Sequence, residues 1–309
     1  MTDVPERVAY FNGRIVPESE VLIPFRDAGF VYGYAVFDTL RTFHHRIYKL
    51  KEHTRRLAQS MAYLGLDPGL SPEEIGRLTE DVVARNVPLL EPDDDYWVTQ
   101  RVTLGSQTEE GWQNTVIIEC KPLPLELRAV CFRDGIEAVV SSIRRTPPEA
   151  LSPRAKTHNY INLILADREA KAQSPDAWAL LLDTHGNLCE GLGSNLFLVR
   201  NGVLLTPRER FVLPGVSRSM IFDLAERIGI DAKEADLDLF DAYAAEEAFM
   251  TSTSLCMCPV RSLNARPIGD GSVPGPVTQS LIEAWCEDLD FDFVAQYTRR
   301  LETSVQSRS

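Results

Sequence analysis

The sequence is short of positive charge and has no long apolar run. Its 309 residues include 32 Lys and Arg against 45 Asp and Glu, which gives a formal net charge of −13 with no basic cluster to offset it. Such a surface repels a phosphate backbone, so we expect no nucleic-acid partner. No apolar run approaches the roughly 18 residues of a membrane-spanning helix, and the first residues lack the pattern of a signal peptide. We therefore expect a cytoplasmic protein with no membrane partner.

The chain also lacks the common metal and nucleotide motifs. Its six cysteines stand singly except for Cys256 and Cys258, whose spacing is too tight for a paired metal knuckle. We therefore expect reduced thiols and no metal site. No Gly-x-Gly-x-x-Gly, P-loop, His-Glu-x-x-His or Gly-x-Ser-x-Gly segment is present. These absences disfavour dinucleotide-binding, nucleoside-triphosphate-binding, zinc-protease and esterase functions.

Length and composition favour a globular protein of two domains. A domain takes about 150 residues on average, and the 44% hydrophobic and 25% charged residues are ordinary globular usage. The segment 121–127 contains two prolines in alternation, which favours an extended, helix-free connection. We predict a small N-terminal domain at 1–120, a linker at 121–127 and a larger C-terminal domain at 128–309.

Hydrophobic periodicity predicts helices and strands that mix without a regular βαβ alternation. Two Asn-Gly pairs, Asn12-Gly13 and Asn201-Gly202, are typical of hairpin turns between short strands. Strands are expected at 8–16 (as a hairpin), 36–43, 95–104, 115–120, 136–141, 178–183, 195–199 and 203–205. Helices are expected at about 51–64, 72–85, 160–172, 216–228 and 277–293. The fold class that follows is α+β, with two such domains rather than one doubly wound sheet.

Lysine is scarce, and one of the six lysines has an unusual position. Five of them flank a helix entry, lie in the linker or stand on faces expected to be solvated: Lys49, Lys51, Lys121, Lys171 and Lys233. Lys156 instead lies where a strand end meets the start of an apolar helix. Position alone would still make it a solvated surface charge, so its interpretation depends on other segments.

Two later segments accompany Lys156. Glu190 follows 34 positions on, in a glycine-rich turn between two apolar strands, although an exposed glutamate is the default interpretation there. The segment 213–218, Leu-Pro-Gly-Val-Ser-Arg, opens an amphipathic helix, and backbone amides at a helix start are suited to bind an anion.

Five segments in order resemble the class IV aminotransferases, which depend on pyridoxal 5′-phosphate (PLP). They are His-Thr-Arg-Arg-Leu at 53–57, Lys-Thr-His-Asn-Tyr at 156–160, Glu-Gly-Leu-Gly-Ser-Asn at 190–195, Leu-Pro-Gly-Val-Ser-Arg at 213–218 and Phe-Met-Thr-Ser-Thr-Ser at 249–254. The resemblance covers roughly residues 8 to 290. It implies a fold-type IV enzyme, with a small N-terminal and a larger C-terminal α/β domain and the cofactor between them. It also implies at least a homodimer, because family members close each active site with residues of a neighbouring subunit.

The resemblance also implies roles for site residues. Lys156 matches the lysine that bonds the aldehyde of the cofactor and then moves a proton. Glu190 matches the acid beside the pyridine nitrogen, and Tyr160 matches the tyrosine that donates to the ring O3′ oxygen, with a core tyrosine as the alternative. Arg56 matches the phosphate-binding arginine, although its neighbour Arg55 could be confused with it. The remaining implied cofactor contacts are Leu213, Val216, Ser217, Ser252 and Thr253.

The expected substrate pocket departs from the amino acid subfamilies. The branched-chain enzymes hold the substrate carboxylate with an arginine where this chain has Thr99, and the D-amino acid enzymes have an arginine where this chain has Leu104. Arg41 and Arg101 remain as substitutes, and Arg101 could equally belong to a structural ion pair. The residues predicted to line the pocket are Phe37, Arg41, Trp97, Thr99, Arg101 and Ser254.

Loss of a carboxylate contact favours amine donors that have no carboxylate. The sequence therefore predicts an (R)-amine transaminase that passes the amino group to a keto acid such as pyruvate or 2-oxoglutarate. A branched-chain or D-amino acid aminotransferase is the alternative, and an aminodeoxychorismate lyase is the alternative from another class. Lys156 argues against a binding protein without enzymatic activity.

Overall fold

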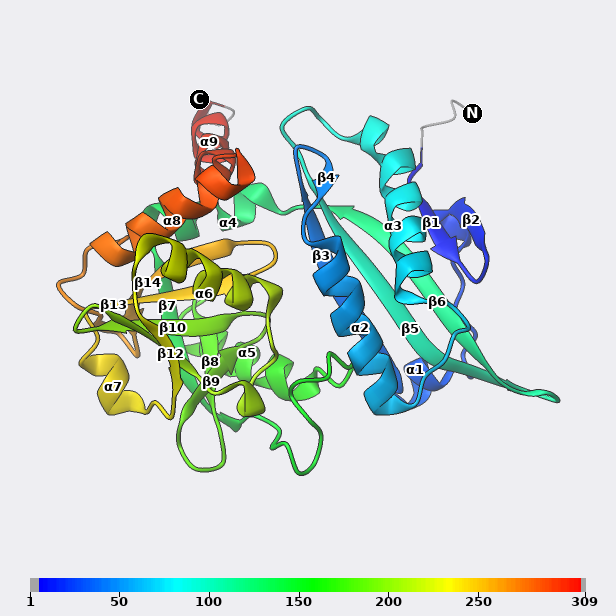
Figure 1. Cartoon of the computed structure of the whole chain (residues 1–309), viewed down its shortest axis with the longest axis horizontal. Coiled ribbons are helices and arrows are strands. Elements are labelled where there is room, and N and C mark those ends of the chain that lie inside the picture. The colour runs from blue at the N-terminus through cyan, green and yellow to red at the C-terminus, as the bar shows by residue number, and fades with distance from the viewer. Residues whose placement is uncertain (1–5, 307–309) are drawn as a thin grey trace. The chain divides into compact units, whose positions relative to one another are not determined.

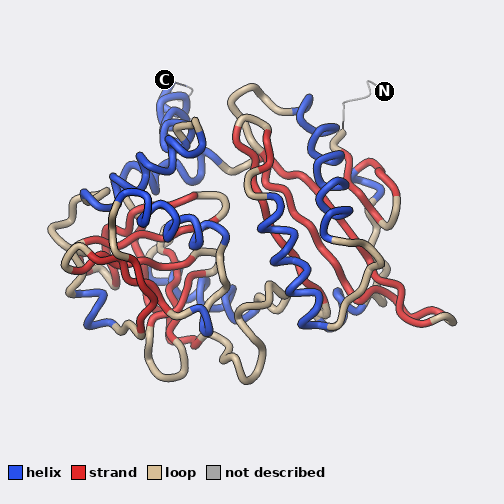
Figure 2. Tube along the Cα trace, viewed as in Figure 1, coloured by secondary structure: helices blue, strands red, loops and turns tan. Residues whose placement is uncertain are grey.

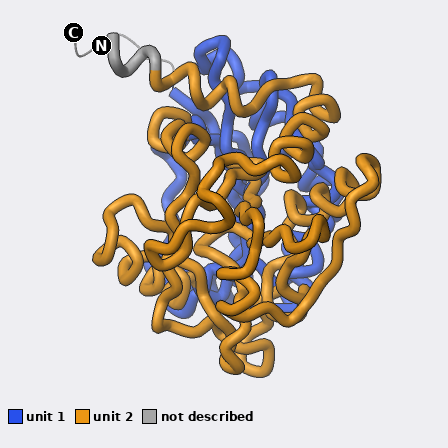
Figure 3. Tube along the Cα trace, turned by 90° about the vertical axis from the view of Figure 1, so that its left-hand side faces the viewer, with its two compact units in different colours: residues 1–123, 155–159 blue, residues 124–154, 160–309 orange. Residues whose placement is uncertain are grey.

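The computed structural model describes residues 6–306, and the chain divides into two compact units (Figure 3). Unit 1 comprises residues Met1–Leu123 and Ala155–Asn159, and unit 2 comprises Pro124–Arg154 and Tyr160–Ser309. Both units combine helices with sheet (Figure 2), so the α+β prediction is confirmed.

Unit 1 is built on a sheet with the strand order β2-β1-β6-β5-β3-β4, all antiparallel. The strands are β1 (Val8–Phe11), β2 (Arg14–Pro17), β3 (Ala35–Phe43), β4 (Arg46–Ile47), β5 (Tyr96–Thr108) and β6 (Gly111–Pro122). The helical segments are η1 (Glu18–Glu20), α1 (Ala28–Tyr32), α2 (Leu50–Leu64), α3 (Pro72–Asn86) and η2 (Val87–Leu89). Helices α2 and α3 lie along the sheet (Figure 1).

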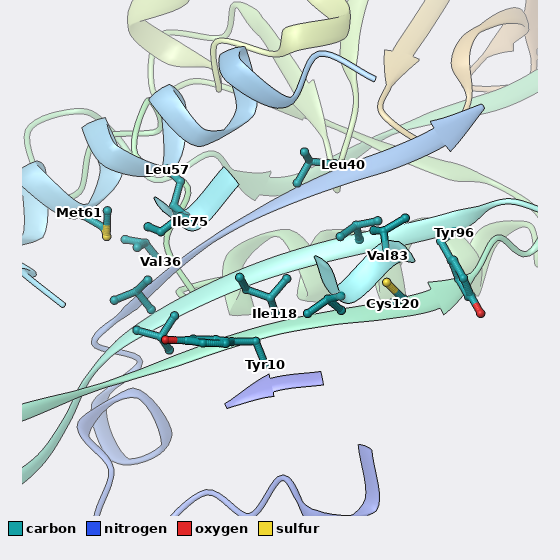
Figure 4. Packing of buried hydrophobic residues seen from close by; sticks show 14 of the residues in the cluster. Tyr10, Val36, Leu40, Leu57, Met61, Ile75, Val83, Tyr96, Ile118 and Cys120 are labelled. Carbon is teal, nitrogen blue, oxygen red and sulfur yellow. The ribbon is translucent and has the colours of Figure 1, made fainter. Parts of the chain in front are cut away.

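The core of unit 1 lies between these two helices and the sheet (Figure 4). Leu57 and Met61 of α2 pack with Ile75 of α3 over Val36 and Ile118 of the strands. Full burial of one such side chain stabilises the fold by roughly 1.5–3 kcal/mol. Helix α2 ends at Leu64, as predicted, and its C-cap Gly65 takes the left-handed conformation. Helix α3 begins at a capping box formed by Ser71 and Glu74.

Unit 2 is built on a second sheet with the path β12-β11-β10-β13-β14-β7-β8-β9, and β15 pairs with β14. The strands are β7 (Ile136–Arg144), β8 (Trp178–Leu182), β9 (Leu188–Gly191), β10 (Asn195–Arg200), β11 (Val203–Pro207), β12 (Ala232–Ala235), β13 (Glu247–Ser252), β14 (Cys256–Leu263) and β15 (Arg266–Pro267). Because β9 pairs with both β8 and β10, the strands from β10 to β9 close into a ring. Closure leaves fewer free strand edges.

Unit 2 also contains several helical segments. They are α4 (Leu125–Asp134), α5 (Ile161–Gln173), η3 (Glu209–Phe211), α6 (Val216–Ile228), α7 (Leu239–Tyr243), α8 (Pro276–Leu289) and α9 (Phe293–Gln306). Leu163, Ala166 and Ala170 of α5 pack on Val139 and Leu181 of the sheet. Across residues 6–306, no helix is long and apolar enough to span a membrane. The same residues bring together no group of three or more His, Cys, Asp or Glu side chains that could hold a metal.

Three predictions about the chain's course need correction. The helix-free linker at 121–127 is wrong, because β6 runs to Pro122 and α4 begins at Leu125; proline is tolerated immediately before or in a first helical turn. The helix expected at 277–293 ends at Leu289, where Asp290 takes the left-handed C-cap conformation that glycine usually supplies. Residues 155–159 belong by their contacts to unit 1 and not to the larger domain.

Candidate active site

Lys156 lies on a short segment that extends the sheet of unit 1 at the outer edge of β3. Thr157 forms an antiparallel bridge with Val36. The Phe37 amide donates to the Lys156 carbonyl at 3.0 Å, and the His158 amide donates to the carbonyl of Ala35 at 2.9 Å. The Lys156 amide in turn donates to Ser60 Oγ on α2 at 3.0 Å. The backbone of the candidate lysine is therefore fixed by both a strand and a helix.

The side chain of Lys156 shares one face of this sheet with the predicted pocket residues. Its Nζ lies 4.6 Å from the ring centroid of Phe37. In the antiparallel pair of β3 and β5, Phe37 is opposite Arg101, Thr39 is opposite Thr99, and Arg41 is opposite Trp97. Directly opposite residues project from the same face, whereas Val36 and Leu40, on the other face of β3, point into the helix-covered core. The structure thus brings Lys156, Phe37, Trp97, Thr99 and Arg101 to the face away from that core.

Both arginines considered for a substrate carboxylate have acidic partners within unit 1. Arg101 Nη1 donates to Glu119 Oε1 at 2.5 Å, and both side chains are about one-third exposed. Arg41 is 1% exposed, its Nη2 is 3.9 Å from Asp95 Oδ2, and its guanidinium stacks 3.9 Å from the Phe43 ring centroid. The ion-pair alternative for Arg101 is realised, and Arg41 is enclosed by protein.

His158 adds a neutral imidazole to this face, which the sequence did not single out. Its ring meets that of Phe37 edge-on at a centroid distance of 5.2 Å. Burial, with the nearby charges of Arg101 and Lys156, lowers the pKa of His158 to about 4, against a smaller opposing effect of Asp27. At neutral pH the ring therefore carries no charge.

Arg56 and Arg55 are distinguished by burial. Arg55 is exposed, whereas Arg56 is 6% exposed and points toward the sheet. Arg56 Nε donates to Asp38 Oδ2 and its Nη2 donates to Asp38 Oδ1, both at 2.7 Å. His53 Nδ1 lies 2.7 Å from the same Oδ1. The sequence signal for this acid is its place between Val36 and Leu40 in a strand with period 2, which predicts a buried carboxylate.

Glu190 in unit 2 is a buried acid with a partner on each carboxylate oxygen. It lies in β9 and is 4% exposed. Arg145 Nε donates to Oε1 at 2.8 Å, and the Leu213 amide donates to Oε2 at 2.9 Å. Asn195 Nδ2 donates to the Leu213 carbonyl at 3.0 Å. Glu190 is therefore not an exposed surface glutamate, and Arg145 is a site residue that sequence reasoning missed.

The start of α6 has the features of an anion-binding helix terminus. Its N-cap is Gly215, no side chain caps it, and Val216 and Ser217 are buried. A Cβ at Gly215 would meet Asn195 Oδ1 at 2.2 Å, so a larger residue here would displace the Asn195 side chain. The first amides of a helix have no partner within the helix and attract negative charge.

The hydroxyl-bearing turn after β13 is anchored by residues of unit 2. Ser252 Oγ accepts from the Leu255 amide at 3.2 Å. Ser254, predicted as a pocket residue, is 5% exposed; Arg128 Nη1 donates to its Oγ at 2.8 Å, and Tyr297 Oη donates to its carbonyl. Thr253 lies between these two serines, and Thr251 Oγ1 is buried without a partner in the described residues.

Tyr160 is the residue that precedes α5. It is half-buried against the cluster formed by α5 and β7. The residues matched to the cofactor are therefore divided between the two units: Arg56 and Lys156 in unit 1, and Tyr160, Glu190, Leu213, Val216, Ser217, Ser252 and Thr253 in unit 2.

The chemistry of this donor set fits PLP. An amine can bond an aldehyde, a buried carboxylate can hold a proton on a ring nitrogen, and an arginine, an uncapped helix start and a hydroxyl are each groups that bind phosphate. Comparison with known proteins decides the family: the model of amino-transferase class IV matches residues 35–263. The chain belongs to the class IV aminotransferases.

Similar proteins of known sequence and structure support this family membership. The chain is 36% identical over 279 residues to a Methanocaldococcus jannaschii protein named provisionally as a branched-chain-amino-acid aminotransferase, covering 89% of this chain and 93% of that one. It is 31% identical over 298 residues to the branched-chain-amino-acid aminotransferase of Escherichia coli K12, covering 92% and 94%.

Among solved structures, the Escherichia coli branched-chain amino acid aminotransferase is similar at a TM-score of 0.85, with 29% identity and coverage of 92% and 94%. A second branched-chain amino acid aminotransferase, complexed with N-(5′-phosphopyridoxyl)-L-glutamate, is similar at 0.82, with 28% identity and coverage of 92% and 94%. The chain is therefore a fold-type IV aminotransferase that depends on PLP. PLP supplies an aldehyde that bonds amines and a pyridine ring that withdraws electrons.

Proposed function

We propose that this enzyme transaminates branched-chain amino acids, with a keto acid such as 2-oxoglutarate or pyruvate as acceptor. The observation that carries the proposal is the similarity to branched-chain aminotransferases over about nine-tenths of both chains. This reverses the order of the two substrate hypotheses that the sequence motifs suggested.

Each matched residue has a role in the proposal. Lys156 bonds the cofactor and afterwards moves the proton of the donor, and its fixed backbone supports this role. Glu190 holds the proton of the pyridine nitrogen, and the salt bridge to Arg145 supports its presence as a carboxylate. Arg56, the start of α6, Ser252 and Thr253 hold the phosphate. Tyr160 donates to the ring oxygen, and Leu213 packs on the ring.

The proposed assembly is a homodimer. Support comes from apolar side chains that are largely exposed in residues 22–34: Leu22 (74%), Phe25 (71%), Phe30 (75%) and Tyr32 (73%). Several large apolar side chains exposed in one segment are typical of protein interfaces. The exposed stretch ends where β3 begins, because Ala35 and Val36 are buried. Sedimentation that gives a fully active monomer would contradict this part of the proposal.

The second candidate function is transamination of (R)-amines. Two observations favour it: Arg101 is paired with Glu119, and Arg41 is enclosed beside Asp95. The motif match adds the prediction that Thr99 replaces the carboxylate arginine of the branched-chain enzymes. A donor that has no carboxylate needs none of these cations.

A donor panel tests the two candidates. L-Leucine, D-alanine and both enantiomers of 1-phenylethylamine are offered with pyruvate and with 2-oxoglutarate. The proposal predicts that kcat/KM for L-leucine exceeds that for the (R)-amine at least tenfold, and the reverse order would establish the second candidate. Pyruvate release from aminodeoxychorismate would instead indicate a lyase.

An Arg101→Leu variant then asks what holds the donor carboxylate. If Arg101 leaves Glu119 to bind it, KM for L-leucine rises at least tenfold and KM for the (R)-amine does not change.

A further inference from the structure

Three ionisable side chains meet in the layer between β3 and α2. Asp38 projects from β3 between Val36 and Leu40, and both of these neighbours belong to the core shown in Figure 4. His53 and Arg56 project from α2 three residues apart and so lie on one face of that helix. Asp38, His53 and Arg56 are 0%, 2% and 6% exposed. Charges buried this deeply are costly unless they are paired.

The pairing within this cluster is complete on the carboxylate. Asp38 accepts from Arg56 Nε on one oxygen and from Arg56 Nη2 on the other, and His53 Nδ1 lies 2.7 Å from the second oxygen. Burial raises the pKa of Asp38, but the charge of Arg56 and the contact with His53 outweigh it, so the pKa lies well below its usual range. Asp38 is therefore an acceptor only, and His53 must donate its Nδ1–H to it.

His53 completes the cluster as a neutral donor. Burial lowers its pKa, as do the charges of Arg56 and Lys156, against the opposing effect of Asp38. A bidentate pair fixes both the position and the plane of a guanidinium. With His53 holding the carboxylate, neither end of the pair can rotate without losing a bond.

The same helix face connects Arg56 to the lysine. Ser60, one turn after Arg56, donates its hydroxyl to the Arg56 carbonyl at 3.0 Å and accepts the Lys156 amide at 3.0 Å. The guanidinium and the backbone of Lys156 are thus held from one stretch of α2. An arginine fixed in advance loses less conformational entropy when it binds an anion than a free one does.

We infer that Asp38 and His53 are positioning residues, which hold the guanidinium of Arg56 ready for the phosphate group of the cofactor. The inference rests on the proposed role of Arg56. Asp38 touches the phosphate-binding group and not the reacting atoms, so its loss weakens phosphate recognition selectively. A role confined to folding would weaken the binding of every cofactor analogue alike.

Two ligands separate these roles. PLP and pyridoxal have the same aldehyde and ring, and only PLP has the phosphate. We expect Asp38→Asn to raise the dissociation constant of PLP from the apoenzyme at least tenfold, measured by absorbance titration, and to change that of pyridoxal less than threefold. Equal factors for the two ligands would overturn the inference.

A second pair of variants decides the question even if Asp38→Asn does not fold. His53→Leu removes the donor to Asp38, and His53→Asn keeps an amide N–H close to the place of Nδ1. We expect His53→Leu to raise the dissociation constant of PLP at least threefold and to leave that of pyridoxal unchanged. His53→Asn should restore most of the lost affinity for PLP. The inference would be overturned if both histidine variants had the same ratio of PLP to pyridoxal dissociation constants as the wild type.

Arg56→Met and Arg55→Met complete the design. The exposed Arg55 is the matched control, and its loss should leave both ligands unchanged. If Arg56→Met leaves the ratio of PLP to pyridoxal binding unchanged, the proposed role of Arg56 is wrong. If Arg56→Met changes that ratio and the Asp38 and His53 variants do not, only the positioning inference is wrong.

Discussion

Units 1 and 2 hold their charged site residues in different ways. In unit 1, Arg56 is held by the bidentate pair with the Asp38 side chain, and His53 donates to the same carboxylate. In unit 2, Glu190 has one side-chain partner, Arg145, and one backbone partner, the Leu213 amide. The start of α6 likewise offers backbone amides to an anion. Side-chain pairs depend on the types of the two residues, whereas backbone donors depend on the path of the chain.

This difference predicts unequal costs when one partner is removed. Asp38→Asn leaves a buried guanidinium without its counter-charge, and we expect it to lower the free energy of unfolding by roughly 3–5 kcal/mol. Arg145→Met should cost about 2 kcal/mol, because Glu190 keeps the hydrogen bond from the Leu213 amide. Urea unfolding of the two apo variants and of the wild type measures both losses in the free energy of unfolding. A loss for Arg145→Met as large as that for Asp38→Asn would show that the backbone partner contributes little.

The stability of unit 1 at low pH tests the burial of His158. The folded-state pKa of His158 is about 4, below the ordinary value of 6.5. The unfolded chain therefore takes up the proton first as pH falls, and stability is full above pH 6.5 and declines toward pH 4. The decline from this group is roughly 3 kcal/mol.

His158→Gln removes this titration, so the urea midpoint should fall less between pH 6.5 and 4 than in the wild type, while the contribution of His53, whose pKa burial also lowers, remains. His185→Gln supplies the control, because it makes the same substitution at a histidine whose side chain is 75% exposed. A profile of His158→Gln that is parallel to the wild type would contradict the assignment.

Gly215 tests the backbone arrangement of unit 2. An alanine Cβ there would meet Asn195 Oδ1 at 2.2 Å and force it away, together with its amide bond to the Leu213 carbonyl. We expect Gly215→Ala to cost about 1–2 kcal/mol and to weaken PLP binding. A Cβ added at Gly193 would have nothing within 4 Å, and Gly193 does not require a positive φ, so Gly193→Ala should stay within about 0.5 kcal/mol. Equal effects of the two substitutions would contradict the steric argument.

Much of the fold and of the candidate site could be predicted from the sequence, because the signals lie in neighbouring residues. The helix at 216–228 has the bounds of α6, and both Asn-Gly pairs occupy hairpin turns with positive φ. These features depend on neighbours along the chain. The ordered motifs predict the roles of Lys156, Glu190 and Arg56, and the structure shows that Glu190 and Arg56 are buried and paired.

The features that were missed depend on contacts between distant residues. Arg145 is 45 positions from Glu190, and the bridge between Val36 and Thr157 spans more than a hundred residues. Neither contact has a local pattern. The break between α8 and α9 was missed for a different reason, because Asp290 takes a conformation that sequence reasoning assigns to glycine.

Reduction of the PLP-loaded enzyme with borohydride, followed by peptide mapping, tests the role of Lys156 most directly. Reduction makes the bond between a lysine and the cofactor permanent. We predict a single phosphopyridoxyl adduct on Lys156, and no adduct and no transamination in Lys156→Ala. An adduct on Lys49, Lys51, Lys121, Lys171 or Lys233, or one that persists in Lys156→Ala, would contradict the assignment of this lysine and of the site built around it.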